Sequence, residues 1–201
     1  MNLYTFLALG DSYTIGEAVP LLSSFPYQTV QLLRTENINM APPEIVAKTG
    51  WTTDELANAM KEHTFLKTYD IVTLLIGVNN QYRGRSTKEY KIEFEQLLQQ
   101  AICLAGQKSD QVVVLSIPDY SVTPFAQSMD AEKINREIDV YNTINKTISQ
   151  TLDVHYINIT ESTREAKKNV FLLAADGLHP SAAEYQKWAQ LLAQKIENIL
   201  R

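Results

Sequence analysis

Residues 5–13 read TFLALGDSY, an apolar run that ends in a glycine, an aspartate and a serine. The run from Thr5 to Leu9 is apolar almost throughout rather than at every second position, which is typical of a strand buried on both faces of a parallel sheet. Similar β-branched or apolar runs recur along the chain, at Glu44 to Lys48, Tyr69 to Ile76, Gln111 to Ile117 and His155 to Ile159. The sequence therefore predicts a parallel five-stranded sheet.

Between these runs lie longer segments whose apolar residues are spaced as on one face of a helix, such as Tyr90, Phe94, Leu97, Ala101 and Ala105. Capping boxes predict where helices begin, at Thr52 with Glu55, Ser86 with Glu89, and Ser181 with Glu184. The alternation of strands and helices predicts an α/β fold of three layers, with helices on both faces of the sheet. No linker or repeat interrupts the pattern, so we expect a single domain over residues 1–201.

Composition excludes several classes of function. With 18 Lys and Arg against 23 Asp and Glu, the net charge is −5, which argues against nucleic acid as a partner. No window reaches the 18 or so apolar residues of a membrane span. One cysteine and three histidines exclude a zinc finger or knuckle, and we expect no cofactor and no metal. Residues 1–4 do not resemble a secretory signal, which leaves a cytoplasmic protein or a secreted one that has lost its signal. The oligomeric state stays open.

Polar residues follow the predicted strands where each strand ends. In an open parallel sheet, ligands bind beyond the carboxyl ends of the strands. We therefore expect four segments to meet at one edge: Gly10-Asp11-Ser12-Tyr13, Thr49-Gly50-Trp51, Gly77-Val78-Asn79-Asn80 and Asp176-Gly177-Leu178-His179-Pro180.

These residue types are the ones that acyl transfer needs. Ser12 is the candidate nucleophile, His179 the general base, and Asp176, three residues earlier, the carboxylate that orients the imidazole. The developing oxyanion can be met by the backbone N–H groups of Ser12 and Gly50 and by the side-chain amide of Asn79. We expect an acyl-enzyme mechanism at this edge of the sheet.

Together the four segments resemble the four sequence blocks of the SGNH/GDSL hydrolase family, over residues 10–180. The resemblance implies a flavodoxin-like sandwich with strand order 2-1-3-4-5. It also implies a triad of Ser12, Asp176 and His179 and an oxyanion hole of Ser12, Gly50 and Asn79. One departure is Asn80, which stands where many members have Asp. We expect this difference to affect only how the loop of Asn79 is held in place, not a catalytic group.

Each segment also has an ordinary structural explanation. Gly10-Asp11-Ser12 alone is a common turn, Asp176-Gly177 is another, and His179-Pro180-Ser181 can be a helix entry capped by Ser181. Finding all of them in order at strand ends favours the enzyme. The alternative from another class is a noncatalytic flavodoxin-like module that binds a ligand, but the loop from Gly10 to Gly16 matches neither phosphate-binding glycine motif. A metallohydrolase is disfavoured because no third ligand accompanies Asp176 and His179.

The substrate is less well specified. The loops around the predicted site carry aromatic side chains and arginines, namely Tyr13, Trp51, Tyr82, Arg83, Arg85 and Phe125. We take Tyr13, Trp51, Tyr82 and Arg83 as candidate substrate contacts, because aromatic rings suit sugars or acyl chains and arginine suits anions. The expected reaction is hydrolysis of a small-molecule ester with a small acyl or acetyl group, on a carbohydrate or a lysophospholipid, with a thioester left open.

Overall fold

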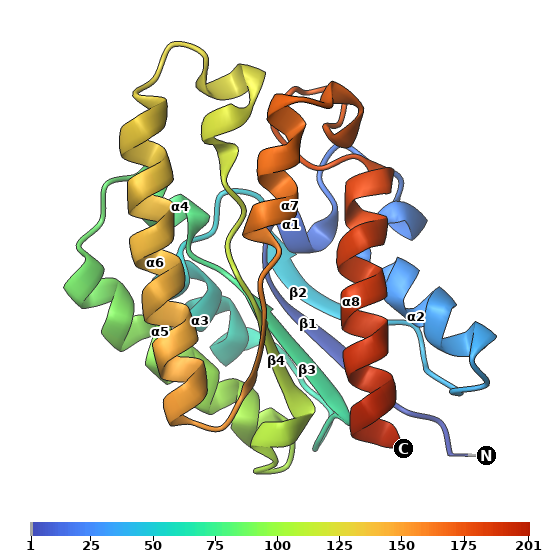
Figure 1. Cartoon of the computed structure of the whole chain (residues 1–201). Helices are drawn as coiled ribbons and strands as arrows, with labels where there is room; N and C mark the ends of the chain where they lie inside the picture. Colours follow the sequence, from blue (N-terminus) through green and yellow to red (C-terminus); the bar gives the residue numbers. More distant parts are fainter. Residues whose placement is uncertain (1) are drawn as a thin grey trace.

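The computed structural model describes residues 2–201, so Met1 of the predicted domain lies outside the described residues. Within this range, five strands form one parallel sheet in the order β2-β1-β3-β4-β5 (Figure 1). This confirms the predicted sheet and strand order. The strands are β1 (Phe6–Asp11), β2 (Glu44–Lys48), β3 (Ile71–Leu75), β4 (Val112–Leu115) and β5 (His155–Ile157).

The strands differ from the predicted runs mainly at their ends. β1 continues past Leu9 because Gly10 and Asp11 pair in register with Ala47 and Lys48 of β2. β3, β4 and β5 are shorter than the apolar runs, because apolar side chains such as Ile76 and Ile117 stay buried after the ladder has ended. At the carboxyl ends of β3 and β4, the side chains therefore stay buried for at least one or two residues after strand-to-strand pairing has stopped.

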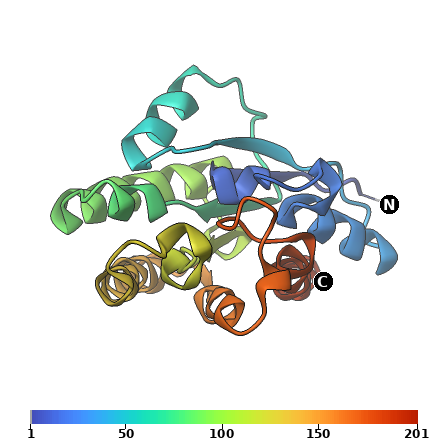
Figure 2. The ribbon, with the colours of Figure 1, turned by 90° about the horizontal axis from the view of Figure 1, so that it is seen from above.

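Helices cover both faces of the sheet, which confirms the predicted three layers. Figures 1 and 2 show α2 and α8 side by side on one face, with α3, α5 and α6 on the other. The helices are α1 (Ser12–Ile15), α2 (Phe25–Thr35), α3 (Thr53–Glu62), α4 (Val78–Tyr82), α5 (Thr87–Leu104), α6 (Ala131–Thr151), α7 (Thr160–Arg164) and α8 (Ala182–Leu200). Among the described helices, not one has the length and apolar character needed to cross a bilayer.

Three of these helices begin at the residues that the capping boxes predict. α3, α5 and α8 each start directly after Thr52, Ser86 and Ser181. At α3 the N–H of Thr52 donates to the Glu55 carboxylate over 2.9 Å, which satisfies a donor that the helix leaves free. The start of α3 is therefore held firmly, directly behind the loop that carries Gly50.

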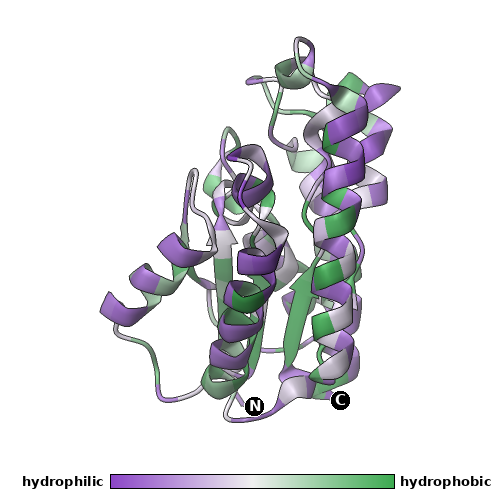
Figure 3. Cartoon of the chain, turned by 90° about the vertical axis from the view of Figure 1, so that its left-hand side faces the viewer, coloured by the Kyte–Doolittle hydropathy of each residue, from purple (hydrophilic) through white to green (hydrophobic). Residues whose placement is uncertain are grey.

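The core lies between the sheet and the two helix layers. Figure 3 shows apolar residues concentrated on the strands and in stripes along the helices. Phe25 of α2 packs against Tyr185 and Trp188 of α8, and all three side chains are fully buried. Burial of these large rings holds the last helix against α2, and the loop of residues 176–180 leads into its N-terminus.

Candidate active site

Ser12 lies at the point where β1 passes into the short helix α1. Its predecessor Asp11 caps that helix by accepting a hydrogen bond from the N–H of Tyr13 over 3.0 Å. Gly10 permits the close approach of β1 to β3, because a Cβ at this position would overlap the carbonyl oxygen of Leu75. Ser12 thereby stands at the carboxyl edge of the sheet, as the first residue of a helix whose second N–H, that of Tyr13, is already used by Asp11.

Asp176 and His179 form a local pair on one turn. The distance between Asp176 Oδ2 and His179 Nδ1 is 2.6 Å. The other carboxylate oxygen accepts the backbone N–H groups of Leu178 and His179, each over 3.0 Å. Gly177, with φ of +67°, gives the turn the left-handed conformation that it needs. The three-residue spacing thus lets one carboxylate hold both the ring and the backbone of His179.

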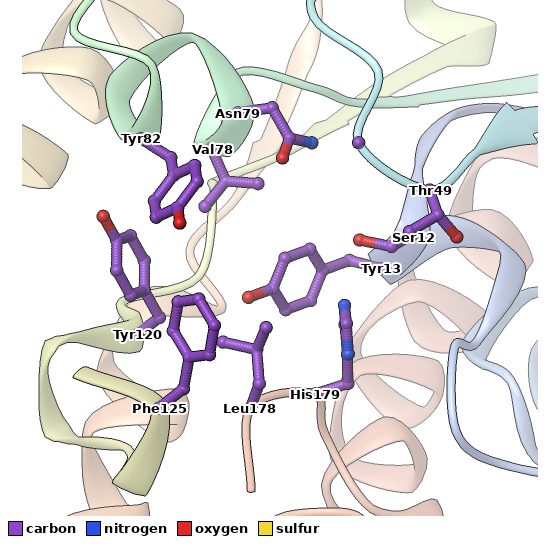
Figure 4. A pocket seen from close by; sticks show the side chains of 11 residues that line it. Ser12, Tyr13, Thr49, Val78, Asn79, Tyr82, Tyr120, Phe125, Leu178 and His179 are labelled. Carbon is purple, nitrogen blue, oxygen red and sulfur yellow. The ribbon is translucent and has the colours of Figure 1, made fainter. Parts of the chain in front are cut away.

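The carboxylate of this pair stays ionised. Partial burial raises the pKa of Asp176, but the hydrogen bonds from the His179 ring and from two backbone N–H groups outweigh it and leave the pKa below its usual value. Since Nδ1 of His179 faces Asp176, Nε2 is the free ring nitrogen, and Figure 4 shows the ring directed toward Ser12. This is the arrangement in which the histidine can take a proton from a serine hydroxyl.

Gly50 lies in a tight turn that follows β2. The N–H of Trp51 donates to the carbonyl of Lys48 over 3.2 Å, and Gly50 has φ of +84°, which fits a type II turn. The hydrogen bond that closes this turn does not use the N–H of Gly50. The turn therefore presents a backbone donor next to the cavity that Ser12 also lines.

Asn79 lies in the first turn of α4, directly after β3. Its Nδ2 donates to the carbonyl of Trp51 over 2.9 Å and lies 3.4 Å from Asp11 Oδ2. Gly77, with φ of +132°, makes the sharp entry into α4, where a Cβ would overlap the Tyr90 ring. The amide is thus held by the loop that carries Gly50.

Asn80, the departure from the family pattern, braces the same two loops. Its Oδ1 accepts the N–H of Thr53 over 3.1 Å, and its Nδ2 donates to Thr53 Oγ1 over 2.6 Å. Thr53 Oγ1 in turn contacts the carboxylate of Glu93. The Thr53 hydroxyl donates to Glu93, so its oxygen needs a donor from position 80. The amide of Asn80 supplies this donor, which an ionised Asp could not.

Two arginines add further ties between these loops. Arg83 donates to the carbonyl of Gly50 over 2.6 Å and contacts Glu55 at 3.2 Å, while Arg85 pairs with Asp54 at 2.6 Å. Among residues 2–201, neither arginine lines the cavity, and Trp51 does not line it either. Of the four predicted substrate contacts, the structure brings Tyr13 and Tyr82 to the cavity and leaves Trp51 and Arg83 outside it.

The cavity itself has a volume of about 120 Å³ and lies between the candidate chemical groups and an apolar wall (Figure 4). Sequence reasoning missed part of this wall. Tyr120 follows the end of β4, where the strand-end rule would have found it, and Leu178 and Val78 lie inside segments that were singled out for other residues. The full lining is Ser12, Tyr13, Thr49, Gly50, Val78, Asn79, Tyr82, Tyr120, Phe125, Leu178 and His179.

Asp11 is the one buried carboxylate among the residues around this edge that has no cation beside it. Burial raises the pKa of Asp11 to about 7, although hydrogen bonds from Tyr13 N–H and Asn79 oppose the shift. Among residues 2–201, no group of three or more His, Cys, Asp or Glu side chains lies close enough to hold a metal ion.

Residues 8–187 match the model of the GDSL-like lipase/acylhydrolase family. Among curated proteins, no sequence matches the chain. Similar solved structures include the acetylxylan esterase Axe2 from Geobacillus stearothermophilus, with 19% identity, 96% of this chain and 94% of that chain covered, and a TM-score of 0.73.

Two further structures share the fold. TesA has 14% identity, 97% and 99% of the two chains covered, and a TM-score of 0.75. The lipase/acylhydrolase from Enterococcus faecalis has 18% identity, 97% and 96% covered, and a TM-score of 0.72. At these identities the likeness concerns the fold, whereas the family match concerns the sequence itself.

Proposed function

Because the chain belongs to the GDSL-like lipase/acylhydrolase family, and is thereby a carboxylic ester hydrolase of the SGNH type, we propose that it hydrolyses small acyl esters with Ser12 as the nucleophile. The observation that carries the assignment is the 2.6 Å contact between Asp176 and His179, on a ring that faces Ser12. This contact fixes the tautomer in which Nε2 of His179 can accept a proton. The alternative of a noncatalytic ligand-binding module would leave that pairing without a purpose.

The first half of the reaction forms an acyl-enzyme. Ser12 Oγ attacks the carbonyl carbon of the ester while its proton passes to His179 Nε2, and the ionised Asp176 stabilises the imidazolium. The C–O bond to the alcohol then breaks, and the alcohol oxygen takes the proton from His179. In the second half, water attacks the acyl group with His179 again as the base, which releases the carboxylic acid and restores Ser12.

The tetrahedral intermediates carry a negative charge on the former carbonyl oxygen. We assign its stabilisation to the N–H groups of Ser12 and Gly50 and to the Asn79 amide. Gly50 has an N–H that its turn does not use. The Asn79 Nδ2 donates to the Trp51 carbonyl over 2.9 Å and makes a longer contact of 3.4 Å to Asp11 Oδ2, and the oxyanion would replace this longer contact. Such donors act best when they are held in place before the charge develops, because no reorganisation is then needed during the reaction.

The cavity favours a short acyl chain as the occupant. Val78, Leu178 and Phe125 make one side of it apolar, and its volume of about 120 Å³ suits a short acyl group, whereas a longer chain would extend out of the opening. Burial of each methylene contributes about 0.8 kcal/mol to binding. An acetylated carbohydrate is the second candidate, since Axe2, which has this fold, is an acetylxylan esterase and aromatic rings such as Tyr82 suit sugar faces.

The test of the nucleophile uses the purified full chain with p-nitrophenyl butyrate. Ser12→Ala should lower kcat by at least about 10⁴-fold, because the triad acts as a unit. A fluorophosphonate probe should label Ser12 of the unchanged protein, as found by peptide mass spectrometry, and activity should persist in EDTA. A Ser12→Ala variant that keeps a substantial share of kcat would sink the assignment.

A further inference from the structure

Tyr13 is buried beside the candidate nucleophile and lines the cavity. Only 3% of its surface is exposed, and its ring lies against the His179 ring with centroids 5.0 Å apart. Figure 4 shows its hydroxyl directed away from Ser12 into the space bordered by Val78, Leu178 and Phe125. A polar group is therefore aimed into the apolar side of the cavity.

None of the hydrogen bonds among residues 2–201 involves this hydroxyl, and it is not one of the fully enclosed polar atoms that lack a partner, so it is open to the cavity. The neighbouring Tyr120, which lines the same cavity, differs in this respect because its hydroxyl donates to Gln81 Oε1 over 2.8 Å. Burial, followed by the nearby charge of Asp11, raises the pKa of Tyr13 well above its usual value, so the hydroxyl keeps its proton and can act as a donor.

Packing alone gives no reason for this hydroxyl. Contact with His179 and burial against Leu178 need only the ring, and a phenylalanine would supply both without placing a polar atom in an apolar space. An apolar group that fills the cavity leaves this donor enclosed without a partner, which is costly, whereas a ligand atom that accepts its hydrogen bond avoids that cost. Sites built in this way discriminate against analogues that lack the matching polar atom.

We propose that the substrate group that fills this cavity carries an oxygen atom that accepts a hydrogen bond from the Tyr13 hydroxyl. The chemistry is that of an oxo, hydroxyl or ether oxygen set in an otherwise apolar group, and it can belong to the acyl chain or to the alcohol. This inference rests on the proposed function, since it takes the ester to be bound at Ser12. Tyr13 is then a specificity-determining residue that selects an oxygenated ester over a plain alkyl ester.

The test measures selectivity within each enzyme, so that a general effect of a substitution on catalysis cancels. For the acyl arm, kcat/KM is measured for p-nitrophenyl 4-oxopentanoate against pentanoate and for 5-oxohexanoate against hexanoate. For the alcohol arm, 2-methoxyethyl butyrate is compared with butyl butyrate. In at least one arm, the unchanged protein should prefer the oxygenated ester, and Tyr13→Phe should reduce that preference roughly 3- to 10-fold, the range of one neutral hydrogen bond.

Tyr120→Phe is the matched control, because it removes a hydroxyl from the same cavity wall that already has a protein partner. In both arms, Tyr120→Phe should have the same ratio of kcat/KM for the oxygenated ester over the alkyl ester as the unchanged protein. The arm in which Tyr13→Phe lowers the ratio identifies whether the oxygen belongs to the acyl chain or to the alcohol.

Two results would overturn the inference. One is an unchanged protein with no preference for oxygenated esters in either arm, a result that needs no variant to fold. The other is a preference that Tyr13→Phe leaves intact. If the unchanged protein hydrolyses the alkyl esters in either case, the proposed function survives while the role of Tyr13 fails; if it hydrolyses none of the esters, both fail together.

Discussion

The two sides of the cavity are built in different ways. On the side of the proposed oxyanion hole, which we call the oxyanion side, Asn79 and Asn80 of α4 form hydrogen bonds with Trp51 and Thr53, and Arg83 donates to the Gly50 carbonyl. On the other side, the rings of Tyr82, Tyr120 and Phe125 meet each other with centroids 6.0–6.3 Å apart. Tyr82 is 52% and Phe125 40% exposed.

This difference fits what each side has to do. A donor stabilises a developing charge only at a narrow range of distances and angles. The donors of the oxyanion side therefore need hydrogen bonds that hold their loops in position before the charge develops. Apolar contact is non-directional and scales with buried area, so the aromatic side can bind groups of several shapes without being fixed. We therefore expect changes on the oxyanion side to lower kcat and changes on the aromatic side to alter which ester is preferred.

Of the changes to these two sides, Asn79→Ala should have the largest effect. If the amide meets charge only as the tetrahedral intermediate forms, its loss should raise the activation free energy by about 3–4 kcal/mol. The value of kcat should then fall by about 10²- to 10³-fold while KM stays nearly unchanged. Steady-state kinetics on p-nitrophenyl butyrate and the unfolding midpoint of the variant separate this from a loss of folding. A rise in KM alone would make Asn79 a contact to the bound substrate and leave Ser12 and Gly50 to form the hole.

Asp11, which lies on the oxyanion side, should make the unfolding free energy of the chain depend on pH. Its folded-state pKa of about 7 lies above the ordinary value of 3.8, so between these values the folded chain holds a proton that the unfolded chain has lost. The resulting stability is present at low pH and is lost as pH rises toward and through 7. Asp11→Asn lacks this titration. The unfolding free energy of the variant, relative to that of the unchanged protein, should therefore increase by roughly 2–4 kcal/mol from pH 4 to pH 8.

Urea unfolding of both proteins at pH 4, 6 and 8 measures this difference directly. Carboxylates such as Asp176, whose pKa is lowered by its partners, change stability in the opposite direction. They are present in both proteins and cancel in the comparison. A difference in unfolding free energy that does not vary with pH would show that Asp11 does not titrate in this range.

The sequence predicted the parts of the site that follow from local pattern. Buried strands, the residues at their ends and the spacing of Asp176 and His179 are all set by neighbours in the chain, and the structure shows the expected strand order and a 2.6 Å contact between Asp176 and His179. The hydrogen bonds between the α4 region and the loop that carries Gly50 were not predictable in this way. Arg83 and Gly50 are 33 residues apart, and no periodicity indicates that a guanidinium will reach that carbonyl rather than solvent or a substrate.

Arg83→Gln tests whether these cross-loop ties hold the oxyanion side in position. Loss of the bond to the Gly50 carbonyl should lower kcat by about 5- to 10-fold with little change in KM, a modest effect because the arginine is partly exposed. Added guanidinium should restore part of the loss in Arg83→Ala. Arg85→Gln is the matched control, since it removes a pairing with α3 but no contact to Gly50, and an equal loss of kcat there would refute a specific role for Arg83.

The smallest effects are expected on the aromatic side, where Phe125→Ala should change the preferred acyl length rather than the chemistry. In the unchanged protein, kcat/KM should rise about fourfold for each methylene from acetate to butyrate, as about 0.8 kcal/mol per buried methylene implies, and should level off once the cavity is full. Removing the ring takes away apolar surface that an acetyl group is too short to reach. Phe125→Ala should therefore leave the acetate rate within about twofold and flatten the rise for longer esters, because less area is buried per methylene. If acetate and hexanoate lost the same factor, Phe125 would be acting on the catalytic groups, and the division of the cavity into a fixed side and an adaptable side would be wrong.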